Sequence, residues 1–161
     1  MTLPTLPTLP TVPSSQAMAL TNGQKRALEN LYAALATDDV DLVDHALTEN
    51  WDDIPLGPGQ QPGRDGIKPV FRMFRTALPD LALTIENIIA EADRAAVRLR
   101  MTGTHNGPLM GIAPTGKPID IVIHEFHEFT GDRLSRTWHL EDLLGLFAQI
   151  GTWPNLGQGD A

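Results

Sequence analysis

The chain has 161 residues, with 12 basic and 20 acidic side chains, a formal net charge of −8 and no cysteine. This length suits one domain with a full hydrophobic core, and the lack of cysteine excludes disulfides, thiolate nucleophiles and cysteine-ligated zinc. The negative charge argues against nucleic acid and against an anionic membrane surface as partners, because phosphate groups attract a basic face.

The two ends of the chain differ from its middle in composition. Residues 1–17 repeat Thr-Leu-Pro, and proline at every third position blocks a helix and favours an extended polyproline conformation. We expect a disordered or loosely docked leader there, with a partner-binding arm as the alternative. A single domain should occupy residues 18–151, followed by a turn-rich tail over 152–161. The first residues lack the basic start and apolar core of a secretory signal, and no run approaches the roughly 18 apolar residues of a membrane span. We therefore expect a cytoplasmic protein.

The first half of the domain carries helical patterns. Thr21 and Gln24 form the pattern of a capping box, and apolar residues at helical spacing follow them. The acidic pair Asp38-Asp39 opens a second, short helix, because acidic residues suit the positive end of a helix. Residues 51–63 are rich in glycine and proline and predict a loop. An amphipathic third helix is predicted over residues 65–78.

The residue pattern in the second half of the domain predicts β-strands. Four are predicted, separated by short turns and followed by a closing helix: residues 81–91, 94–104, 119–129 and 134–140, then 141–151. Apolar and polar residues alternate along the second of these strands, which indicates one covered and one wetter face. Helices first and an antiparallel meander after them predict an α+β domain, whose curved sheet wraps on the helices and leaves a pocket at its mouth.

The histidines are the first candidates for function. His105 has the parity of the covered positions of its strand, so it is either a core histidine or a donor to a substrate oxygen. His124 and His127 lie three residues apart on one strand and point to opposite faces, so they cannot share a metal ion. Periodicity alone does not decide which of them faces the pocket. His45 and His139 are expected at the surface.

Asp142 opens the final helix and is either a helix cap or an acid/base group. A carboxylic base needs a raised pKa, and burial among apolar groups can supply up to ~3–5 units. The helix N-terminus opposes this effect by only about 0.3–1 kcal/mol. Asp53 is either a residue of the pocket mouth or part of an exposed acidic loop. The apolar walls of the pocket are expected from Trp51, Phe74, Met101, Met110 and Trp138.

Several short stretches together carry a family resemblance. They are Gly103-Thr104-His105-Asn106-Gly107, the run from Gly111 to Lys117, Trp138, Asp142, and the run from Leu144 to Gly151. In this order and spacing they resemble the SnoaL-like polyketide cyclase family over about residues 20–151. The resemblance implies a cone-shaped α+β barrel of the nuclear-transport-factor-2-like (NTF2-like) superfamily. In this fold a curved mixed or antiparallel sheet wraps on three N-terminal helices, with a short C-terminal helix, and the protein is usually a dimer.

The resemblance also implies a reaction. Family members of known activity close a ring by intramolecular aldol condensation on a hydrophobic polyketide, without cofactor or metal. Their acid/base aspartate falls on Asp142, an assisting histidine on His124 with His127 as the second match, and the histidine of the glycine-rich run on His105. Asp53 falls where the best-known cyclases have an asparagine. An isomerase, a dehydratase or an epoxide hydrolase acting on another hydrophobic ring is the alternative, as is a non-catalytic module for ligand binding or dimerisation.

Overall fold

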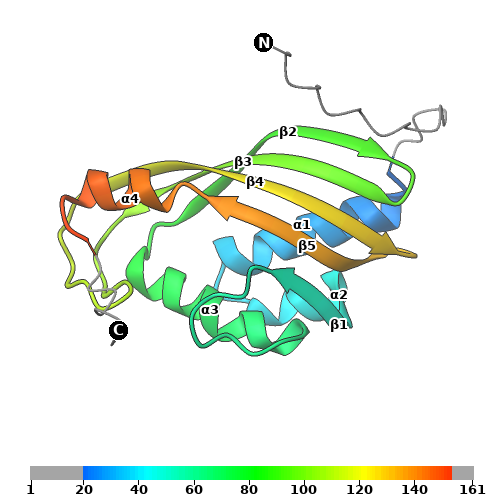
Figure 1. The fold of residues 1–161 in the computed structure, drawn as a ribbon, viewed down its shortest axis with the longest axis horizontal. Coiled ribbons are helices and arrows are strands. Elements are labelled where there is room, and N and C mark those ends of the chain that lie inside the picture. The colour runs from blue at the N-terminus through cyan, green and yellow to red at the C-terminus, as the bar shows by residue number, and fades with distance from the viewer. Residues whose placement is uncertain (1–19, 154–161) are drawn as a thin grey trace, which may run out of the picture.

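The computed structural model describes residues 20–153 (Figure 1), so the predictions for the leader and for most of the tail lie outside the described residues. The helices are α1 (Asn22–Ala36), the 3-10 turn η1 (Val40–Leu42), α2 (Val43–Ala46), α3 (Arg64–Ala77) and α4 (Leu143–Ile150). The strands are β1 (Leu47–Ile54), β2 (Ala82–Glu91), β3 (Arg94–Thr104), β4 (Pro118–Thr130) and β5 (Arg133–Glu141).

One five-stranded sheet has the order β1-β5-β4-β3-β2. β1 runs parallel to β5, and the other neighbours are antiparallel. Helices α1 to α3 lie against one face of the sheet, which we call the inner face, while α4 follows β5 at one end (Figure 1). The predicted α+β architecture, with three N-terminal helical segments, a curved mixed sheet and a short C-terminal helix, is confirmed.

The predicted loop over residues 51–63 is wrong in its first part. Residues Leu47–Ile54 form β1, although the strand contains Asn, Asp and Glu, which have low strand propensity. Pairing with β5 and the burial of Trp51 and Asp53 override that propensity, since these two side chains alternate inward while Asp52 between them is exposed. This additional strand, β1, therefore brings two of the predicted site residues, Trp51 and Asp53, onto the inner face.

The predicted capping box begins α1 and also ties it to the sheet. The Gln24 backbone N–H donates to Thr21 Oγ1 at 3.0 Å, and the Thr21 N–H donates to Gln24 Oε1 at 2.9 Å. Thr21 Oγ1 in turn donates to Asp132 Oδ1 at 2.8 Å, and Gln24 Nε2 donates to the Gly131 carbonyl at 3.4 Å. The start of the domain is thus fixed beside the turn that joins β4 to β5.

The inner face of the sheet holds the hydrophobic core. On β3 the predicted alternation is confirmed, because Val97, Leu99 and Met101 are buried while Arg98 and Arg100 are exposed. Apolar side chains of α1, α2 and β4 join the same cluster. Within residues 20–153, no helix combines the length and the apolar character needed to cross a bilayer.

Gly107 allows the segment after β3 to approach the end of α3. The backbone N–H groups of Asn106 and Gly107 both donate to the Ala77 carbonyl at 3.0 Å. A Cβ at Gly107 would lie 2.1 Å from the Thr76 carbonyl oxygen. We therefore expect Gly107→Ala to lower the free energy of unfolding by about 1–3 kcal/mol, the usual cost of overpacking, which a urea titration would measure. Gly57→Ala is the control, because that glycine has no positive φ and a Cβ there would meet only one flexible side chain, at 3.2 Å. Equal losses at both sites would contradict the steric explanation.

Candidate active site on the inner face of the sheet

Polar side chains interrupt the apolar inner face along β4 and β5. We call this set the polar strip, and it consists of Tyr32, Trp51, Asp53, Glu125, His127, Thr137, His139 and Glu141. Glu125 is opposite His139 in the β4–β5 register, and His127 is opposite Thr137. Glu141 is the last residue of β5, and β1 and α1 supply the other three members. The strip brings together two carboxylate–imidazole pairs in a region that helices cover.

The deep part of the strip is a continuous hydrogen-bond network. Tyr32 Oη donates to Glu125 Oε2 at 2.7 Å, and His127 Nε2 lies 3.1 Å from the same oxygen. His127 Nδ1 lies 2.9 Å from Thr137 Oγ1. The indole N–H of Trp51 donates to Thr137 Oγ1 at 3.0 Å. Five residues from four elements are therefore joined through buried atoms.

Only one arrangement of protons uses all of these contacts with a neutral imidazole. An indole N–H can only donate, so Thr137 Oγ1 accepts from Trp51 and its own O–H is free to donate to His127 Nδ1. The Nε2–H of His127 then donates to Glu125, whose carboxylate accepts from Tyr32 as well. Each donor in the chain has an acceptor, so the network holds His127 in one tautomer and one ring orientation.

The outer part of the strip is built around His139. His139 Nδ1 lies 2.8 Å from Glu141 Oε1, and its Nε2 lies 3.2 Å from Asp53 Oδ1 and 3.0 Å from the Pro55 carbonyl. Gln60 Nε2 donates to the other oxygen of Asp53 at 2.7 Å. Both ring nitrogens of His139 face acceptors only, which suits an imidazolium that donates at both ends.

Burial and neighbouring charges set the ionisation of the strip. Burial on its own would lower the pKa of His139, but the hydrogen bonds and charges of Asp53 and Glu141 raise the pKa to about 10. Burial would raise the pKa of Glu125, but hydrogen bonds from His127 and Tyr32 and the charge of His139 hold it below its usual value. Burial, the Glu125 charge and their hydrogen bond raise the pKa of Tyr32 well above 10.0. The strip thus holds a cationic imidazole among carboxylates.

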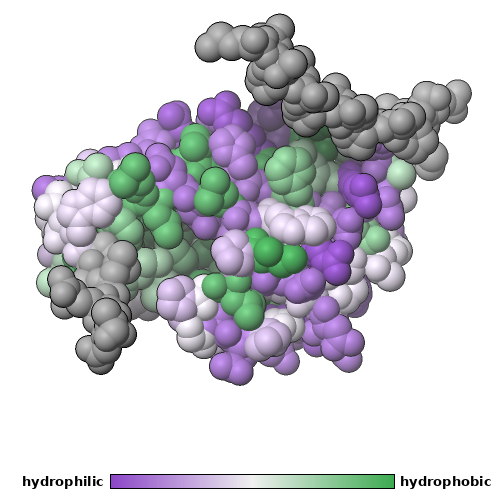
Figure 2. All heavy atoms as spheres, in the orientation of Figure 1, coloured by the Kyte–Doolittle hydropathy of each residue, from purple (hydrophilic) through white to green (hydrophobic). Residues whose placement is uncertain are grey.

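Exposure rises along the strip toward one end. The His127 side chain is 0% exposed and Glu125 13%, whereas His139 is 18% and Glu141 25% exposed. Within residues 20–153, Glu141 Oε2 has no hydrogen-bond partner, while Oε1 is held by His139. Glu141 is therefore the carboxylate of the strip that a small molecule entering from the open end would meet first. Figure 2 shows a recess bordered by apolar side chains between α4 and α3, at the end of the fold where β5 passes into α4.

The elevated pKa of His139 predicts a specific pH dependence of stability. Its pKa is about 10 in the folded protein against an ordinary value of 6.5, so its stabilising effect is complete below about pH 6.5. This effect, on the order of a few kcal/mol, is lost as the pH rises from 6.5 through 10. A titration of the His139 ring protons by NMR should give a midpoint far above 6.5, and His139→Gln should remove this part of the pH dependence of unfolding. A midpoint near the ordinary value would contradict the predicted pairing.

Three of the predicted site residues lie outside this inner site. Asp142 is exposed and caps α4, with its Oδ1 accepting from the Gly145 N–H at 2.8 Å, so it has the geometry of a helix cap and lacks the apolar burial considered for an acid/base role. His124 is exposed on the outer face of the sheet, opposite in direction to the buried His127. Trp138 also lies on the outer face and stacks under the Arg136 guanidinium at 5.4 Å. Strand parity explains both outward residues, because each neighbours an inward residue of the strip.

The other predicted residues lie inside or at the border of the core. Trp51 and Asp53 belong to the polar strip, Met101 is fully buried in the core, and Phe74 and Met110 pack partly exposed against it. His105 is buried as expected, but it orders its own turn. Its Nδ1 lies 3.0 Å from Thr115 Oγ1, and its carbonyl accepts from the N–H groups of Thr115 and Gly116. Among the residues that the structure describes, no hydrogen bond joins it to the strip.

Five members of the strip were not predicted, namely Tyr32, Glu125, Thr137, His139 and Glu141. His139 was expected at the surface but is largely covered, unlike His45, which is exposed as expected. The sequence does contain a signal for them, since Glu125-x-His127 and His139-x-Glu141 each place a carboxylate and an imidazole on one face of a strand. Within residues 20–153, no group of three or more His, Asp or Glu side chains has the arrangement of a metal site.

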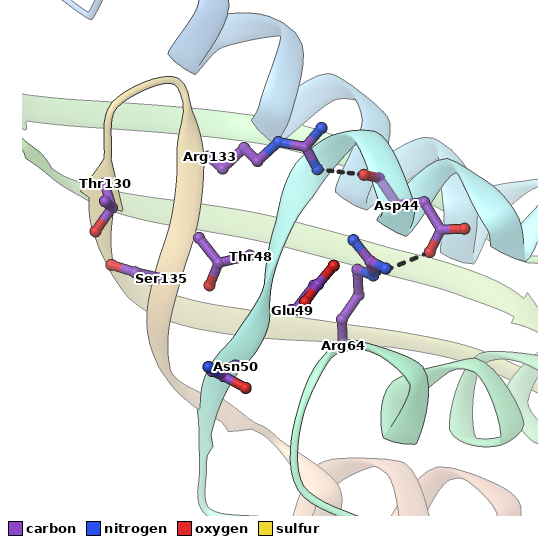
Figure 3. Close-up of a pocket in the computed structure, with 8 residues that line it drawn as sticks. All are labelled: Asp44, Thr48, Glu49, Asn50, Arg64, Thr130, Arg133 and Ser135. Atoms are coloured by element: carbon purple, nitrogen blue, oxygen red, sulfur yellow. Dashed lines mark hydrogen bonds and ion pairs between the residues drawn. The ribbon is translucent and has the colours of Figure 1, made fainter.

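Two surface hollows lie apart from the mouth of the strip. One, of about 660 Å³, is near the β4–β5 turn and is lined by Asp44, Thr48, Glu49, Asn50, Arg64, Thr130, Arg133 and Ser135 (Figure 3). Its two guanidinium groups are already engaged, because Arg64 pairs with the Asp44 carboxylate at 3.1 Å and Arg133 donates to the Asp44 carbonyl. The second, of about 630 Å³, is on the outer face of the sheet around Phe126 and Trp138.

Comparisons with known proteins agree with the fold. The model of the SnoaL-like polyketide cyclase family matches residues 25–150. TsrD from Streptomyces laurentii is 25% identical with a TM-score of 0.76, over 84% of this chain and 100% of that chain. A candidate polyketide cyclase from Bacillus cereus is 29% identical with a TM-score of 0.72, over 89% of this chain and 95% of that one. AclR from Streptomyces galilaeus, a candidate hydroxylase, is 23% identical with a TM-score of 0.68, over 84% and 89%, and shows the fold alone. No curated protein sequence matches the chain.

Proposed function

Because the chain belongs to the SnoaL-like polyketide cyclase family, we propose that its polar strip catalyses an intramolecular aldol-type ring closure on a hydrophobic, polyketide-like molecule. The observation that carries this proposal is the state of Glu141. One of its carboxylate oxygens is fixed by His139 at 2.8 Å, and the other has no partner within residues 20–153. A fixed, partly covered carboxylate with one open oxygen is suited to general-base work.

The proposed reaction needs no group beyond the protein and its substrate. Glu141 takes a proton from a carbon flanked by two carbonyls. The resulting enolate carbon attacks a third carbonyl, elsewhere in the same molecule. A carbon–carbon bond forms, the carbonyl π electrons move to its oxygen, and the protonated Glu141 returns the proton to that oxygen. Holding both carbons in contact contributes much of the acceleration, because an oriented intramolecular step avoids the entropic cost of an encounter.

His139 supports the base in this scheme. As an imidazolium fixed between Asp53 and Glu141, it places a positive charge beside the site where the enolate forms. Preoriented charges in a site that excludes water stabilise such a developing anion more than water does. The neighbouring network of Tyr32, Glu125 and His127 lies beside it, with Glu125 opposite His139 in the β4–β5 register. Asp142, which the resemblance placed in the role of the base, acts here as a helix cap.

A direct test uses an aromatic compound that carries a 1,3-dicarbonyl side chain and a further carbonyl group that the enolate carbon can attack. Incubation in D2O should give two signals above a protein-free control, faster deuterium exchange at the acidic carbon by NMR and a ring-closed product by chromatography and mass spectrometry. Exchange without closure would still support Glu141 as the base. It would point to an isomerase-type reaction, which begins with the same removal of a proton. If a panel of such compounds binds but shows neither exchange nor closure, the site is a binding site and the proposal fails.

A hydrophobic small molecule and a second copy of the chain are the partners that family membership implies, and sedimentation equilibrium of the full chain tests the homodimer directly.

A further inference from the structure

The loop between β1 and α3 contacts the polar strip at two points. The Pro55 carbonyl oxygen lies 3.0 Å from Nε2 of His139, and Gln60 Nε2 donates to Asp53 Oδ2 at 2.7 Å. The Asp53 side chain is only 3% exposed, so the Gln60 amide donates to a carboxylate that is almost completely covered. A buried charge is costly unless hydrogen bonds compensate it. Gln60 therefore supplies Asp53 with a hydrogen-bond donor from outside the sheet.

The Gln60 amide satisfies its contacts in one orientation only. Its Oε1 accepts from the Gly57 N–H at 2.9 Å, and the Gln60 backbone N–H donates to the Gly57 carbonyl at 3.0 Å. Gly59 completes this turn with a φ of 77°, a conformation that suits glycine. If the amide were turned over, its NH2 group would face a donor and its oxygen would face the Asp53 carboxylate. The turn thus directs the N–H donor of Gln60 at Asp53.

The residue after Gln60 is held against α3. A Cβ at position 66 would clash with the Gln61 carbonyl oxygen, so the loop lies directly on the first turn of that helix. Gly66 permits this close approach because it has no side chain. The Gln61 side chain is exposed, and within residues 20–153 it makes no hydrogen bond. Gln60 is therefore fixed on both sides, by the turn before it and by α3 after it.

The two loop contacts determine which proton of His139 is free to move. Three carboxylates face the ring, those of Asp53 on β1, Glu141 on β5 and Glu125, which is opposite His139 on β4. Nε2 meets two groups that can only accept, the Asp53 carboxylate and the Pro55 carbonyl, so a hydrogen stays on Nε2. Within the described part of the chain, the hydrogen-bond partner of Nδ1 is Glu141, at 2.8 Å. The Nδ1–H is therefore the proton that the imidazolium shares with Glu141.

We propose that Gln60 is a positioning residue of the active site, which acts through Asp53 to keep a hydrogen on Nε2 of His139 and to direct Nδ1–H at Glu141. This role rests on the proposed function of Glu141 as the base. When Glu141 takes the substrate proton, the imidazolium beside it must stay charged and in place to stabilise the enolate. A His139 ring that rotated, or that lost its Nε2–H, would not do so. Gln60 thus supports the reaction without touching the substrate.

Gln60→Glu tests this role because it nearly preserves the shape of the side chain. One oxygen of the new carboxyl group still accepts from Gly57, and the other replaces the amide nitrogen that lies 2.7 Å from Asp53 Oδ2. Two carboxylates this close cannot both be ionised, so they share a proton and one pKa of the pair is raised. Below that pKa the protonated carboxyl group donates to Asp53 as the amide does. Above it, repulsion displaces Asp53 from His139.

The expected result is a pH-dependent loss of activity. With the compound that tests ring closure, kcat of Gln60→Glu relative to the parent should fall about ten- to a hundredfold from low to high pH, the size that a small misplacement of a catalytic group produces. KM should change little, because the Gln60 amide is bound within the protein at both ends. Gln61→Glu is the matched control, since it adds the same charge on an exposed side chain one residue away.

The His139 ring gives a second readout that needs no substrate. In Gln60→Glu, its NMR signals should show an additional step with a midpoint above about 4.3, the ordinary pKa of a glutamate. The parent protein and Gln61→Glu should lack this step. Melting temperatures of all variants, measured at the same pH values, check that the fold persists.

A second variant separates the hydrogen bond from folding. Gln60→Met keeps the length of the side chain without its donor, so kcat should be low at every pH, whereas Gln60→Glu recovers at low pH. A folding defect cannot imitate a recovery within one variant. If Gln60→Glu matched Gln61→Glu at every pH, in kcat and in the His139 signals, the positioning role of Gln60 would be wrong. A step in the His139 signals without turnover by any variant, the parent included, would support the positioning role and refute the proposed reaction instead.

Discussion

Replacing Glu141 with glutamine is expected to slow both deuterium exchange and ring closure by about 10²–10⁴-fold, the usual contribution of one positioned acid/base group. Glutamine keeps the shape of the side chain, and its amide oxygen can still accept from His139 Nδ1. The side chain loses its negative charge beside His139 and, with it, the ability to take a proton. The folded structure should persist, with a small fall in melting temperature from the weaker hydrogen bond to the imidazolium.

The neighbouring residue supplies a matched control. Asp142→Asn removes a carboxylate one residue away, yet asparagine caps helices as well as aspartate does. This variant should therefore keep both the rate and the stability of the parent protein. If Asp142→Asn lost the activity and Glu141→Gln retained it, the base would be the helix cap and the proposed role of Glu141 would be wrong. Rates and melting temperatures of the two variants, measured side by side, decide between the two carboxylates.

The largest loss of stability is expected from Thr137→Val. Valine has nearly the shape of threonine but leaves two buried partners of the hydroxyl unpaired, the Trp51 indole N–H and His127 Nδ1. Each unpaired buried polar group costs about 1–3 kcal/mol, so we expect a total loss of roughly 2–5 kcal/mol. Urea unfolding followed by circular dichroism measures this loss, and the slope with denaturant should stay that of the parent protein.

Serine at position 137 separates the hydroxyl from the methyl group. Thr137→Ser keeps the hydrogen bonds and removes one buried methyl, which costs about 0.8 kcal/mol. The further change Trp51→Phe in the valine variant should restore part of the stability, because it removes the unpaired donor and leaves only the acceptor His127 Nδ1 without a partner. Equal losses for the serine and valine variants would show that packing, rather than the network, dominates at this position.

The main architecture could be predicted from the sequence because most elements have strong local patterns. The capping box of Thr21 and Gln24 and the alternation around Val97 reflect short-range rules that tertiary contacts then reinforce. β1 could not be predicted in this way. Its polar residues have low strand propensity, and only pairing with β5, which lies about 85 residues further along the chain, makes it a strand.

The candidate site was predicted less completely, for a reason of geometry. Parity identifies which residues of one strand share a face, but it does not say which face is covered. His127 and His124 differ only in that respect, and the contact of His127 with Tyr32 of α1 decides it. The strip across β4 and β5 also depends on a register that shifts between Glu128 and Phe129. A regular hairpin counted from Thr130 and Arg133 would place Arg136 opposite His127, and the link to Thr137 would not be expected.

That irregularity in the β4–β5 ladder has a consequence for how this protein could change over time. Because β-strand side chains alternate, one residue gained or lost beside the bulge would turn the whole following stretch of β5 over. Trp138 and Leu140 would then line the cavity, and His139 and Glu141 would face solvent. A single-codon insertion or deletion could in this way convert a charged lining into an apolar one. Homologous proteins could thus bind chemically different ligands although their sequences differ very little.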